Sequence, residues 1–400
     1  METIKPNNIA ELETPCFILD NKEFERSING FKLALNKYFF SNIIGYSVKT
    51  NSLPYCLCLA RQLGCYAEVV SHDEYELALL CGYSKDHIIY NGPMKSKNTF
   101  LDAIKNGAIV NIETKREIEW LKELHLDKEY SIGIRVNVNI SKISIEDAKD
   151  NDDFSRFGFC YESGELFNAI EQINKLNNIT ISGLHVHRTS KTRSISFYKN
   201  LLEYTCGIIK EFDLKLNYLD IGGGYFGIFP NAPSYDDYSN AFYEVISNHE
   251  LDNISIIVEP GNAIIASAFS YITTVIDTKQ VENGQIVTTN GSRNDIDPLF
   301  AKNDYIKEFF YTNQHSEIVP KQFITGATCL EFDKLFSIEN SHKLKIGDLI
   351  IYKNVGAYTM CLTPLFINYF PRVYLKDSDH YSIIRDKWTA KDFINKSKLI

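Results

Sequence analysis

The sequence predicts a (β/α)8 TIM barrel followed by an all-β domain. Between residues 40 and 262, short apolar runs alternate with longer segments of helical period, which is the pattern of βα units around a parallel sheet. There are eight such runs, which favours a closed barrel over an open sheet. After residue 261 the runs become β-rich and are separated by turns. We therefore expect a barrel over residues 25–265 and a β-domain, a barrel or sandwich, made of 1–24 and 266–400.

The individual elements follow from the same periodicities. The expected barrel strands are 43–48, 66–70, 88–90, 108–112, 132–136, 181–187, 217–221 and 254–258. Apolar residues recur at helical spacing in 53–63, 74–81, 115–124, 164–173, 197–212 and 238–247. Strands of the second domain are expected at 271–277, 285–289, 322–325, 348–352 and 370–374. Residues 14–20 are also strand-like, and we place them with this later sheet.

Composition narrows the class of protein. The 400 residues carry 42 Lys plus Arg against 51 Asp plus Glu, a net charge of −9, with no basic run to follow a nucleic acid. No apolar stretch approaches the roughly 20 residues of a membrane span, and the first residues lack the apolar core of a signal peptide. The nine cysteines form no Cys-x-x-Cys pair and are expected to be reduced. We expect a cytoplasmic protein whose most polar stretch, 146–153, is a solvated loop, with a loop next to an active site as the alternative.

Polar residues stand where the predicted strands end, which is where barrel enzymes carry their chemistry. Lys49 follows the first strand, and a lysine at the mouth of a buried strand can lose its proton through desolvation and attack a carbonyl. A surface lysine is the ordinary alternative. The other strand ends supply Glu68, Ser71, Asn91, Glu113, Arg135, Asn137, His185, His187, Gly222, Gly223, Gly224, Glu259 and Gly261.

The triple glycine formally opens a G-x-G-x-x-G pattern over residues 222–227. A dinucleotide fold needs a helix to begin at once, whereas here Pro230 and Pro233 follow, and proline breaks helices. Three glycines after a buried strand still expose backbone N–H groups to an anion. We interpret the motif as a cradle for a single phosphate, with a simple tight turn as the alternative.

Two histidines alternate on the sixth strand, as in a metal pair. We disfavour a metal, because no third and fourth ligand is apparent at the other strand ends. His185 is expected to make a buried hydrogen bond, and His187 to stack as a neutral ring on an aromatic cofactor. With Lys49 as amine, the glycine turn as phosphate site and Glu259 as partner of a ring nitrogen, the set matches the needs of pyridoxal 5'-phosphate.

Nine segments taken in order resemble one known family. They are Y-S-V-K-T-N at 46–51, E-V-V-S-H-D-E at 68–74, R-V-N at 135–137, S-R-F-G at 155–158, H-V-H-R-T-S at 185–190, D-I-G-G-G-Y at 220–225, E-P-G-N at 259–262, C-L-E-F-D at 329–333 and G-A-Y at 356–358. Together they resemble the fold-type III pyridoxal-phosphate decarboxylases, the diaminopimelate and ornithine decarboxylase family. Members of that family combine an alanine-racemase-like barrel with a β-domain.

The resemblance implies residue roles. Lys49 would carry the cofactor as a Schiff base, and Cys329 of the partner subunit would protonate the quinonoid carbanion after carbon dioxide leaves, a role suited to a thiol. Asp333, also from the partner, would contact the substrate, so active sites would be shared in a homodimer. The implied cofactor-binding residues are Lys49, Glu68, Ser71, Arg135, His187, Ser190, Gly222, Gly223, Gly224, Glu259, Gly261 and Tyr358.

Several positions depart from the family pattern. Asn262 stands where the family has arginine and Thr189 where it has glycine, so Arg188, Arg193 or Arg293 could supply the missing contacts or could equally be surface residues. Of these, Arg188 and Arg293 are the substrate-binding candidates.

Leu330 replaces the acid that holds the substrate's distal amine in diaminopimelate and ornithine enzymes, and an apolar side chain cannot pair an ammonium. Glu331 is displaced by one position, which in an extended segment points it to the other side.

We therefore expect a decarboxylase for an α-amino acid other than standard diaminopimelate or ornithine, with an anionic or modified side chain. The alternatives are a decarboxylase of basic amino acids such as diaminopimelate, ornithine or lysine, a racemase, and a non-catalytic pyridoxal-phosphate-binding regulator. A racemase would need a second base on the opposite face of the ring, and such regulators usually lack the second domain.

Overall fold

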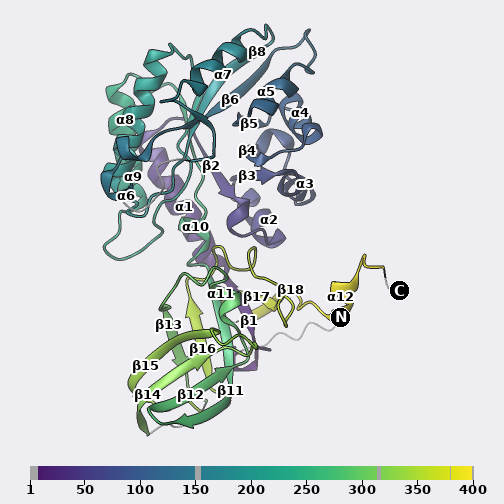
Figure 1. Cartoon of the computed structure of the whole chain (residues 1–400), viewed down its shortest axis with the longest axis vertical. Coiled ribbons are helices and arrows are strands. Elements are labelled where there is room, and N and C mark those ends of the chain that lie inside the picture. Colours follow the sequence, from purple (N-terminus) through teal and green to yellow (C-terminus); the bar gives the residue numbers. More distant parts are fainter. Residues whose placement is uncertain (1–7, 149–154, 313–316, 379, 399–400) are drawn as a thin grey trace. The chain divides into compact units, whose positions relative to one another are not determined.

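The structure, a computed structural model, describes residues 8–148, 155–312, 317–378 and 380–398. These residues form two compact units (Figure 1). One unit comprises Ser27–Ala263. The other joins the described residues up to Arg26 with those from Ile264 onward. The chain passes between the units within two helices, α1 (Asn21–Tyr38) and α10 (Asn262–Ile265).

Eight parallel strands form a closed ring in the first unit. Its strands are β2 (Asn42–Ser47), β3 (Tyr66–Ser71), β4 (Ile88–Met94), β5 (Ile109–Ile112), β6 (Tyr130–Asn137), β8 (Ile179–Val186), β9 (Tyr218–Asp220) and β10 (Ser255–Val258). They pair in the order β5-β4-β3-β2-β10-β9-β8-β6, and pairing of β5 with β6 closes the ring. A short strand, β7 (Phe159–Cys160), adds to β6. The predicted (β/α)8 barrel is confirmed, and each predicted strand overlaps an observed one.

Helices lie outside the ring and follow its strands (Figure 1). They are α2 (Pro54–Gln62), α3 (His72–Leu80), α4 (Lys97–Lys105), α5 (Lys115–Leu121), α6 (Ile145–Ala148), α7 (Glu165–Asn174), α8 (Ile195–Glu211) and α9 (Tyr235–Asn248). Serine hydroxyls cap several of them at the N-terminus, as Ser194 does for α8 and Ser234 for α9. No helix among the described residues is long and apolar enough to cross a membrane.

The polar stretch at 146–153 is not simply the solvated loop that the sequence predicted. Its first residues belong to α6, and the side chain of Asp147 is completely buried. Residues 149–153 lie outside the described part of the chain. The prediction was wrong for Asp147. Acidic residues are usually exposed, but this carboxylate can be buried because Ser190, Lys191 and Thr192, from a distant segment, donate hydrogen bonds to it.

Glycines on two adjacent strands make room for a tyrosine inside the barrel. A Cβ at Gly183 on β8 would lie 2.0 Å from the ring of Tyr218 on β9, and one at Gly133 on β6 would lie 2.2 Å from the Tyr218 hydroxyl. That hydroxyl donates a hydrogen bond to Asn111 Oδ1 at 2.8 Å. The ring also packs with Ile89 and Ile257 in a buried cluster. The barrel interior is therefore a packed apolar core, and polar side chains such as Asn111 lie next to it.

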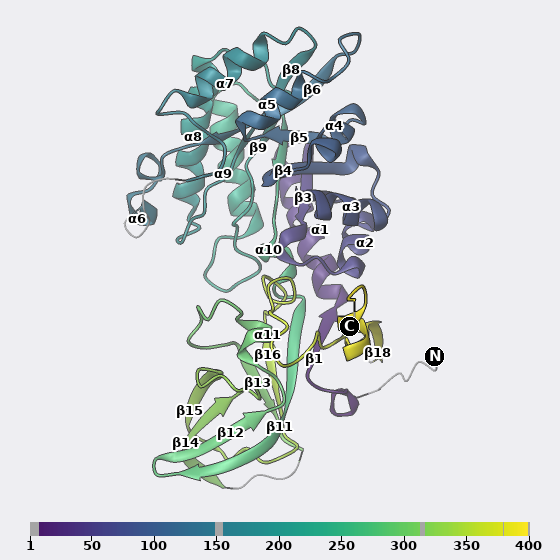
Figure 2. The same cartoon turned by 45° about the vertical axis from the view of Figure 1, so that its right-hand side comes forward.

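The second unit is a nine-stranded sheet (Figure 2). Its strands are β1 (Cys16–Asp20), β11 (Phe269–Val281), β12 (Gly284–Thr289), β13 (Lys307–Phe310), β14 (Ile318–Thr325), β15 (Lys334–His342), β16 (Leu349–Lys353), β17 (Arg372–Asp377) and β18 (His380–Arg385). Two short helices, α11 (Arg293–Ile296) and α12 (Ala390–Ile394), complete it. As predicted, the strand near residues 14–20 joins this sheet: β1 pairs with β11 and β17. Strands β13, β15 and β18 were not predicted.

Substitution of Gly183 by alanine tests the packing of Tyr218. The new methyl group would overlap the ring, so we expect the free energy of unfolding to fall by about 3 kcal/mol. Gly207 on α8 has open space around its Cβ position, so Gly207→Ala should instead stabilise the protein by about 1 kcal/mol. Urea unfolding followed by circular dichroism measures both, and an unchanged midpoint for G183A would contradict this packing.

Candidate active site

Lys49 lies in a 3-10 turn directly after β2 and pairs with a buried carboxylate. This turn, η2, spans Val48–Thr50. The Nζ of Lys49 donates to Glu68 Oε2 at 2.6 Å, and the lysine side chain is 39% exposed. The expected desolvated lysine is therefore not what the structure shows: Lys49 is half-exposed and ion-paired. The carboxylate that pairs with it comes from the adjacent strand, β3.

Glu68 is held in place from three sides. Besides Lys49, the Ser47 hydroxyl donates to Oε2 at 2.6 Å and Asn91 Nδ2 donates to Oε1 at 3.2 Å. Burial acts to raise the pKa of Glu68, but the charge of Lys49 and these hydrogen bonds outweigh burial and lower the pKa. Glu68 is therefore an ionised carboxylate under the mouth of the barrel.

Two asparagines extend this contact across the barrel. Asn91 on β4 donates to Glu259 Oε1 at 2.5 Å as well as to Glu68. Asn111 on β5 donates to Asn91 Oδ1 at 2.8 Å and to Asp220 Oδ2 at 3.2 Å. The chain of contacts thus leads from Lys49 through Glu68 to the carboxylates on β9 and after β10. Sequence reasoning placed Asn91 at a strand end without a role and missed Asn111, although both are polar residues within apolar runs.

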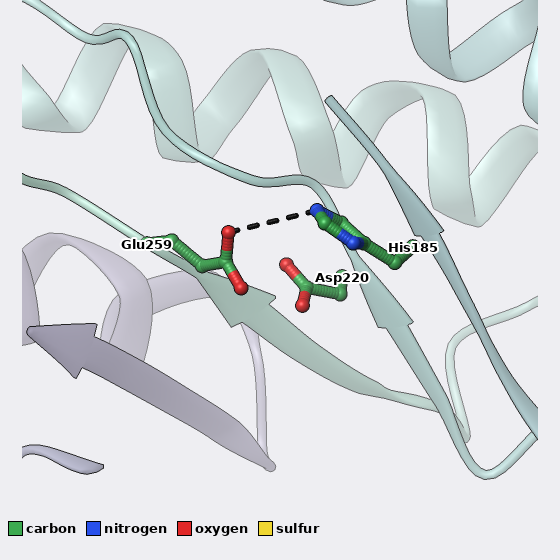
Figure 3. Close-up of side chains that lie close together, drawn as sticks. All are labelled: His185, Asp220 and Glu259. Carbon is green, nitrogen blue, oxygen red and sulfur yellow. Dashed lines mark ion pairs between the residues drawn. The ribbon is translucent and has the colours of Figure 1, made fainter. Parts of the chain in front are cut away.

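His185 on β8, Asp220 on β9 and Glu259 directly after β10 lie close together (Figure 3). Each is buried, and their ligand-type atoms lie within 4.8 Å of one another. Burial raises the pKa of Glu259 well above its usual range, and the neighbouring charges of Asp220 and Glu68 add to this effect. Burial also raises the pKa of Asp220 to about 7. Both carboxyl groups are therefore close enough, and buried enough, that a cation beside them is needed for both to be ionised.

His185 corrects one expectation. Neither ring nitrogen has a hydrogen-bond partner among the described residues, and the closest charged group is Glu259, with its Oε2 3.6 Å from His185 Nε2. The predicted buried hydrogen bond is therefore absent from the described part of the chain. Asp220 and Glu259 are also the additional ligand-type residues that sequence reasoning did not find near this histidine, because they follow two other strands.

His187 lies against the glycine turn. A Cβ at Gly222 would come within 2.6 Å of His187 Cβ, and Gly223 N donates to His187 Nδ1 at 3.3 Å. Burial, together with the charges of Arg135 and Lys49, lowers the pKa of His187 to about 3. The imidazole is therefore neutral at physiological pH, as stacking on a cofactor ring requires.

The glycine turn needs glycine for steric reasons. Gly222 and Gly224 have φ of +71° and +98°, and a Cβ at Gly223 would lie 2.3 Å from the carbonyl oxygen of Glu259. The next helix, α9, begins only at Tyr235, as expected for a phosphate cradle rather than a dinucleotide fold. Because the N–H groups of Gly222 and Gly223 already donate to Asp220 and His187, an anion would meet the later part of the turn.

Other predicted cofactor residues have partners within the barrel. Arg135 on β6 forms a 2.7 Å ion pair with Glu113 and lies over the ring of Phe157. Its Nε has no hydrogen-bond partner among the described residues. Ser71 caps α3 by accepting from Glu74 N at 3.1 Å.

Three further candidates follow β8 and β10. A Cβ at Gly261 would lie 2.1 Å from Thr50 Oγ1, so that position favours glycine for close packing. Ser190 is buried and donates to Asp147 Oδ1 at 2.9 Å. Arg188 lies two residues beyond the end of β8 and is partly buried.

The candidates in the second unit fall into two groups. Cys329 and Tyr358 are exposed, and Tyr358 has a left-handed backbone with φ of +55°. Asp333 is buried and accepts hydrogen bonds from Arg293 N at 2.8 Å and from the Thr328 hydroxyl at 2.6 Å. It therefore secures the turn that carries Cys329, which favours a structural role over the substrate contact that the resemblance implied.

Arg293 is likewise engaged within its own unit. Its Nε donates to Asp297 Oδ2 at 3.0 Å, and its other nitrogens donate to the carbonyls of Lys302 and Lys334. These partners favour a structural role for Arg293 as well. The residues after Cys329 are not extended: Asp333 N donates to Leu330 O at 2.9 Å and closes a turn. The inference that Glu331 points to the opposite side of an extended segment was therefore wrong.

Comparison with known proteins identifies the family of this chain. Residues 22–266 match the family described as pyridoxal-dependent decarboxylase, pyridoxal binding domain. The chain belongs to the pyridoxal-dependent decarboxylases, which are carboxy-lyases whose cofactor is pyridoxal phosphate.

Individual relatives agree with this assignment over most of the chain. The chain is 27% identical to diaminopimelate decarboxylase of Aquifex aeolicus over 88% of its length and 83% of the relative. It is 25% identical to the Archaeoglobus fulgidus enzyme of the same name over 100% and 96%. The crystal structure of diaminopimelate decarboxylase from M. jannaschii has the same fold, with a TM-score of 0.84, 22% identity and coverage of 98% and 93%.

The residues present fit pyridoxal phosphate. Burial raises the pKa of the Glu259 and Asp220 carboxyl groups, and a cation beside them would favour their ionised forms, which suits a protonated pyridine nitrogen. His187 offers a neutral flat ring beside a turn that has no side chains. Lys49 supplies an amine at the same mouth. These side chains therefore suit the ring nitrogen, the ring face and the aldehyde of the cofactor.

Substitution of Glu259 by glutamine tests the crowding of carboxylates in cofactor-free protein. The folded state holds Glu259 neutral while the unfolded chain ionises above its usual pKa of 4.5, so this residue costs stability as pH rises above that value. Glutamine stays neutral at every pH. Chemical unfolding should show E259Q gaining stability relative to the original protein between pH 5 and 7, by about 1 kcal/mol or more. A difference that is constant with pH would contradict an elevated pKa.

Proposed function

We propose that the barrel mouth binds pyridoxal phosphate through Lys49 and uses it to remove the α-carboxylate of an amino acid. The main support for this proposal is the chain of hydrogen bonds that leads from Lys49 through Glu68 and Asn91 to Glu259. It joins the amine and the ring-nitrogen partner at one site, at the spacing set by three barrel strands. The bound cofactor supplies an electron sink that stabilises a carbanion at the substrate's α-carbon.

The residues of the chain have complementary tasks in this proposal. Lys49 would hold the cofactor through its side-chain amine, and Glu68 would pair with that amine whenever it is free and protonated, as it does in this structure. Glu259 stays ionised when the cationic ring nitrogen lies beside it. His187, kept neutral by burial, packs on the ring face without adding charge. We assign the later part of the glycine turn and Ser190, which follows β8, to the phosphate of the cofactor.

Lys49→Ala should abolish the visible absorbance of the covalently bound cofactor and the release of carbon dioxide, because no other amine is proposed for the attachment. Lys199 is a matched control: it also pairs with a glutamate, Glu244, and its side chain is 38% exposed. Lys199→Ala should keep both signals at the original level. Retention of the absorbance band in K49A would reject the role of Lys49.

The second unit is proposed to complete the site. Cys329 is an exposed thiol on a turn held by Asp333, so it is available to act as a proton donor to the substrate's α-carbon. In accord with the resemblance, we assign this thiol and Tyr358 to the active site of a second copy, which makes the protein a homodimer with shared sites. The proposed compartment is the cytoplasm, where a thiol stays reduced.

The proposed substrate is an α-amino acid without a distal ammonium group. Leu330 follows Cys329 directly and offers no charge to hold such a group. The names of the relatives favour a second candidate, diaminopimelate or a similar basic amino acid. The two candidates differ in the charge of the substrate's side-chain end, which Leu330 would face.

A panel of anionic, neutral and basic amino acids distinguishes the two candidates through release of carbon dioxide. We expect the highest kcat/KM for a substrate without a distal ammonium, and Leu330→Glu should raise kcat/KM for diaminopimelate and ornithine by about 10-fold. Highest activity of the original protein with diaminopimelate would reject this substrate preference. Racemisation without carbon dioxide, or bound cofactor with neither reaction, would instead support a racemase or a regulator.

A further inference from the structure

Five hydrogen-bond donors of the described residues surround the buried carboxylate of Asp147. Its Oδ1 accepts from the Ser190 hydroxyl at 2.9 Å, Lys191 N at 2.6 Å and Thr192 N at 3.0 Å. Its Oδ2 accepts from the Thr192 hydroxyl and from the Ser144 hydroxyl, both at 2.8 Å. The side chain is fully buried. One carboxylate therefore joins the segment after β6 to the segment after β8.

These donors keep the carboxylate charged. Burial acts to raise the pKa of Asp147, but the hydrogen bonds from the Thr192 N–H and from the hydroxyls of Ser144, Thr192 and Ser190 outweigh it and lower the pKa. A buried ionised carboxylate in a concave group of N–H and O–H donors is a strong link, since removing it would leave several donors unsatisfied. The turn at 190–192 therefore depends on Asp147 for its conformation.

The turn is also fixed at its far end. Arg193 has a left-handed backbone with φ of +49°, and its N–H donates to the Ser190 hydroxyl at 2.8 Å. Its carbonyl accepts from the Tyr238 hydroxyl at 2.7 Å, and its guanidinium lies over the ring of Phe226. Phe226 directly follows the glycine turn and Tyr225. Asp147 links the segments after β6 and β8 by hydrogen bonds, and Arg193 links the segment after β8 to that after β9 through its contact with Phe226.

We propose that Asp147 is a positioning residue for the phosphate end of the cofactor, acting through the turn that carries Ser190. This inference rests on the proposed binding of pyridoxal phosphate at the barrel mouth. The Ser190 hydroxyl has one proton, which Asp147 accepts in this structure. When that proton is donated to a phosphate instead, the other four donors among the described residues continue to bind Asp147. The turn therefore keeps its shape while Ser190 changes partner.

Titration of cofactor-free protein with pyridoxal phosphate and with pyridoxal, which lacks the phosphate, tests the inference. Asp147→Asn offers one oxygen acceptor in place of two, so we expect its Kd for pyridoxal phosphate to rise about 10-fold or more, and its Kd for pyridoxal to change less than about 3-fold. Binding is followed by visible absorbance. Thr192→Val provides a second variant in case D147N does not fold. It removes one of the five donors to Asp147 that the described residues supply, so its effect should be smaller and equally selective for pyridoxal phosphate.

Asp348 provides a matched control in the other unit. It is buried and accepts from Thr312 N, the Thr312 hydroxyl and Lys345 N. Asp348→Asn should lower thermal stability and leave both Kd values unchanged. A double-mutant cycle adds a second readout, since D147N and S190A should be less than additive if Asp147 acts through Ser190.

Three results would overturn the inference. They are an unchanged Kd for pyridoxal phosphate in both D147N and T192V, equal weakening of pyridoxal and pyridoxal phosphate, and tighter binding of pyridoxal phosphate by D147N, which would mean that the carboxylate opposes the phosphate. Failure of the original protein to bind pyridoxal phosphate would instead reject the proposed function itself.

Discussion

The closed ring of backbone hydrogen bonds is the constraint on which the rest of this structure depends. Pairing of β5 with β6 turns eight parallel strands into a barrel and brings all their carboxyl ends to one mouth. Residues far apart in sequence meet there: Asn91 and Glu259 are 168 positions apart and share a hydrogen bond. Strand β2 pairs with both β3 and β10, so the Lys49–Glu68 pair lies next to the strand that Glu259 follows.

The mouth so formed gathers the buried acidic side chains of Glu68, Asp220 and Glu259. Glu68 is ionised because Lys49 and two hydrogen-bond donors stabilise its charge. Glu259 also accepts a hydrogen bond from Asn91, but burial and the charges of Asp220 and Glu68 raise its pKa and keep it neutral. A protein gains nothing in stability from this crowding, since each elevated pKa costs free energy at neutral pH. Such strain is common at functional sites and is relieved by the ligand that the site binds. The cation expected here is the protonated ring nitrogen of the family's cofactor.

The fold could be predicted almost completely from the sequence. The barrel strands have apolar runs that are readable without tertiary context, since they are buried on both faces. The β-domain was harder: β13, β15 and β18 are only partly buried, so their apolar signal is weak. Candidate site residues could be predicted where they follow a strand directly, as with Lys49, His187 and Glu259. Asn111 and Asp147 could not, because their importance lies in hydrogen bonds to distant segments.

The sequence by itself determined the barrel, the eight strand ends and the type of chemistry that their residues can perform. These depend on local periodicity and on residue types, which a linear chain displays directly. Only the tertiary structure decided which of those residues touch. It paired Lys49 with Glu68 instead of burying the amine, left the His185 nitrogens without partners among the described residues, and placed Asp147 under the Ser190 turn. The physical reason is that hydrogen bonds and charge–charge contacts act over a few ångströms, and chain folding alone sets which groups come that close.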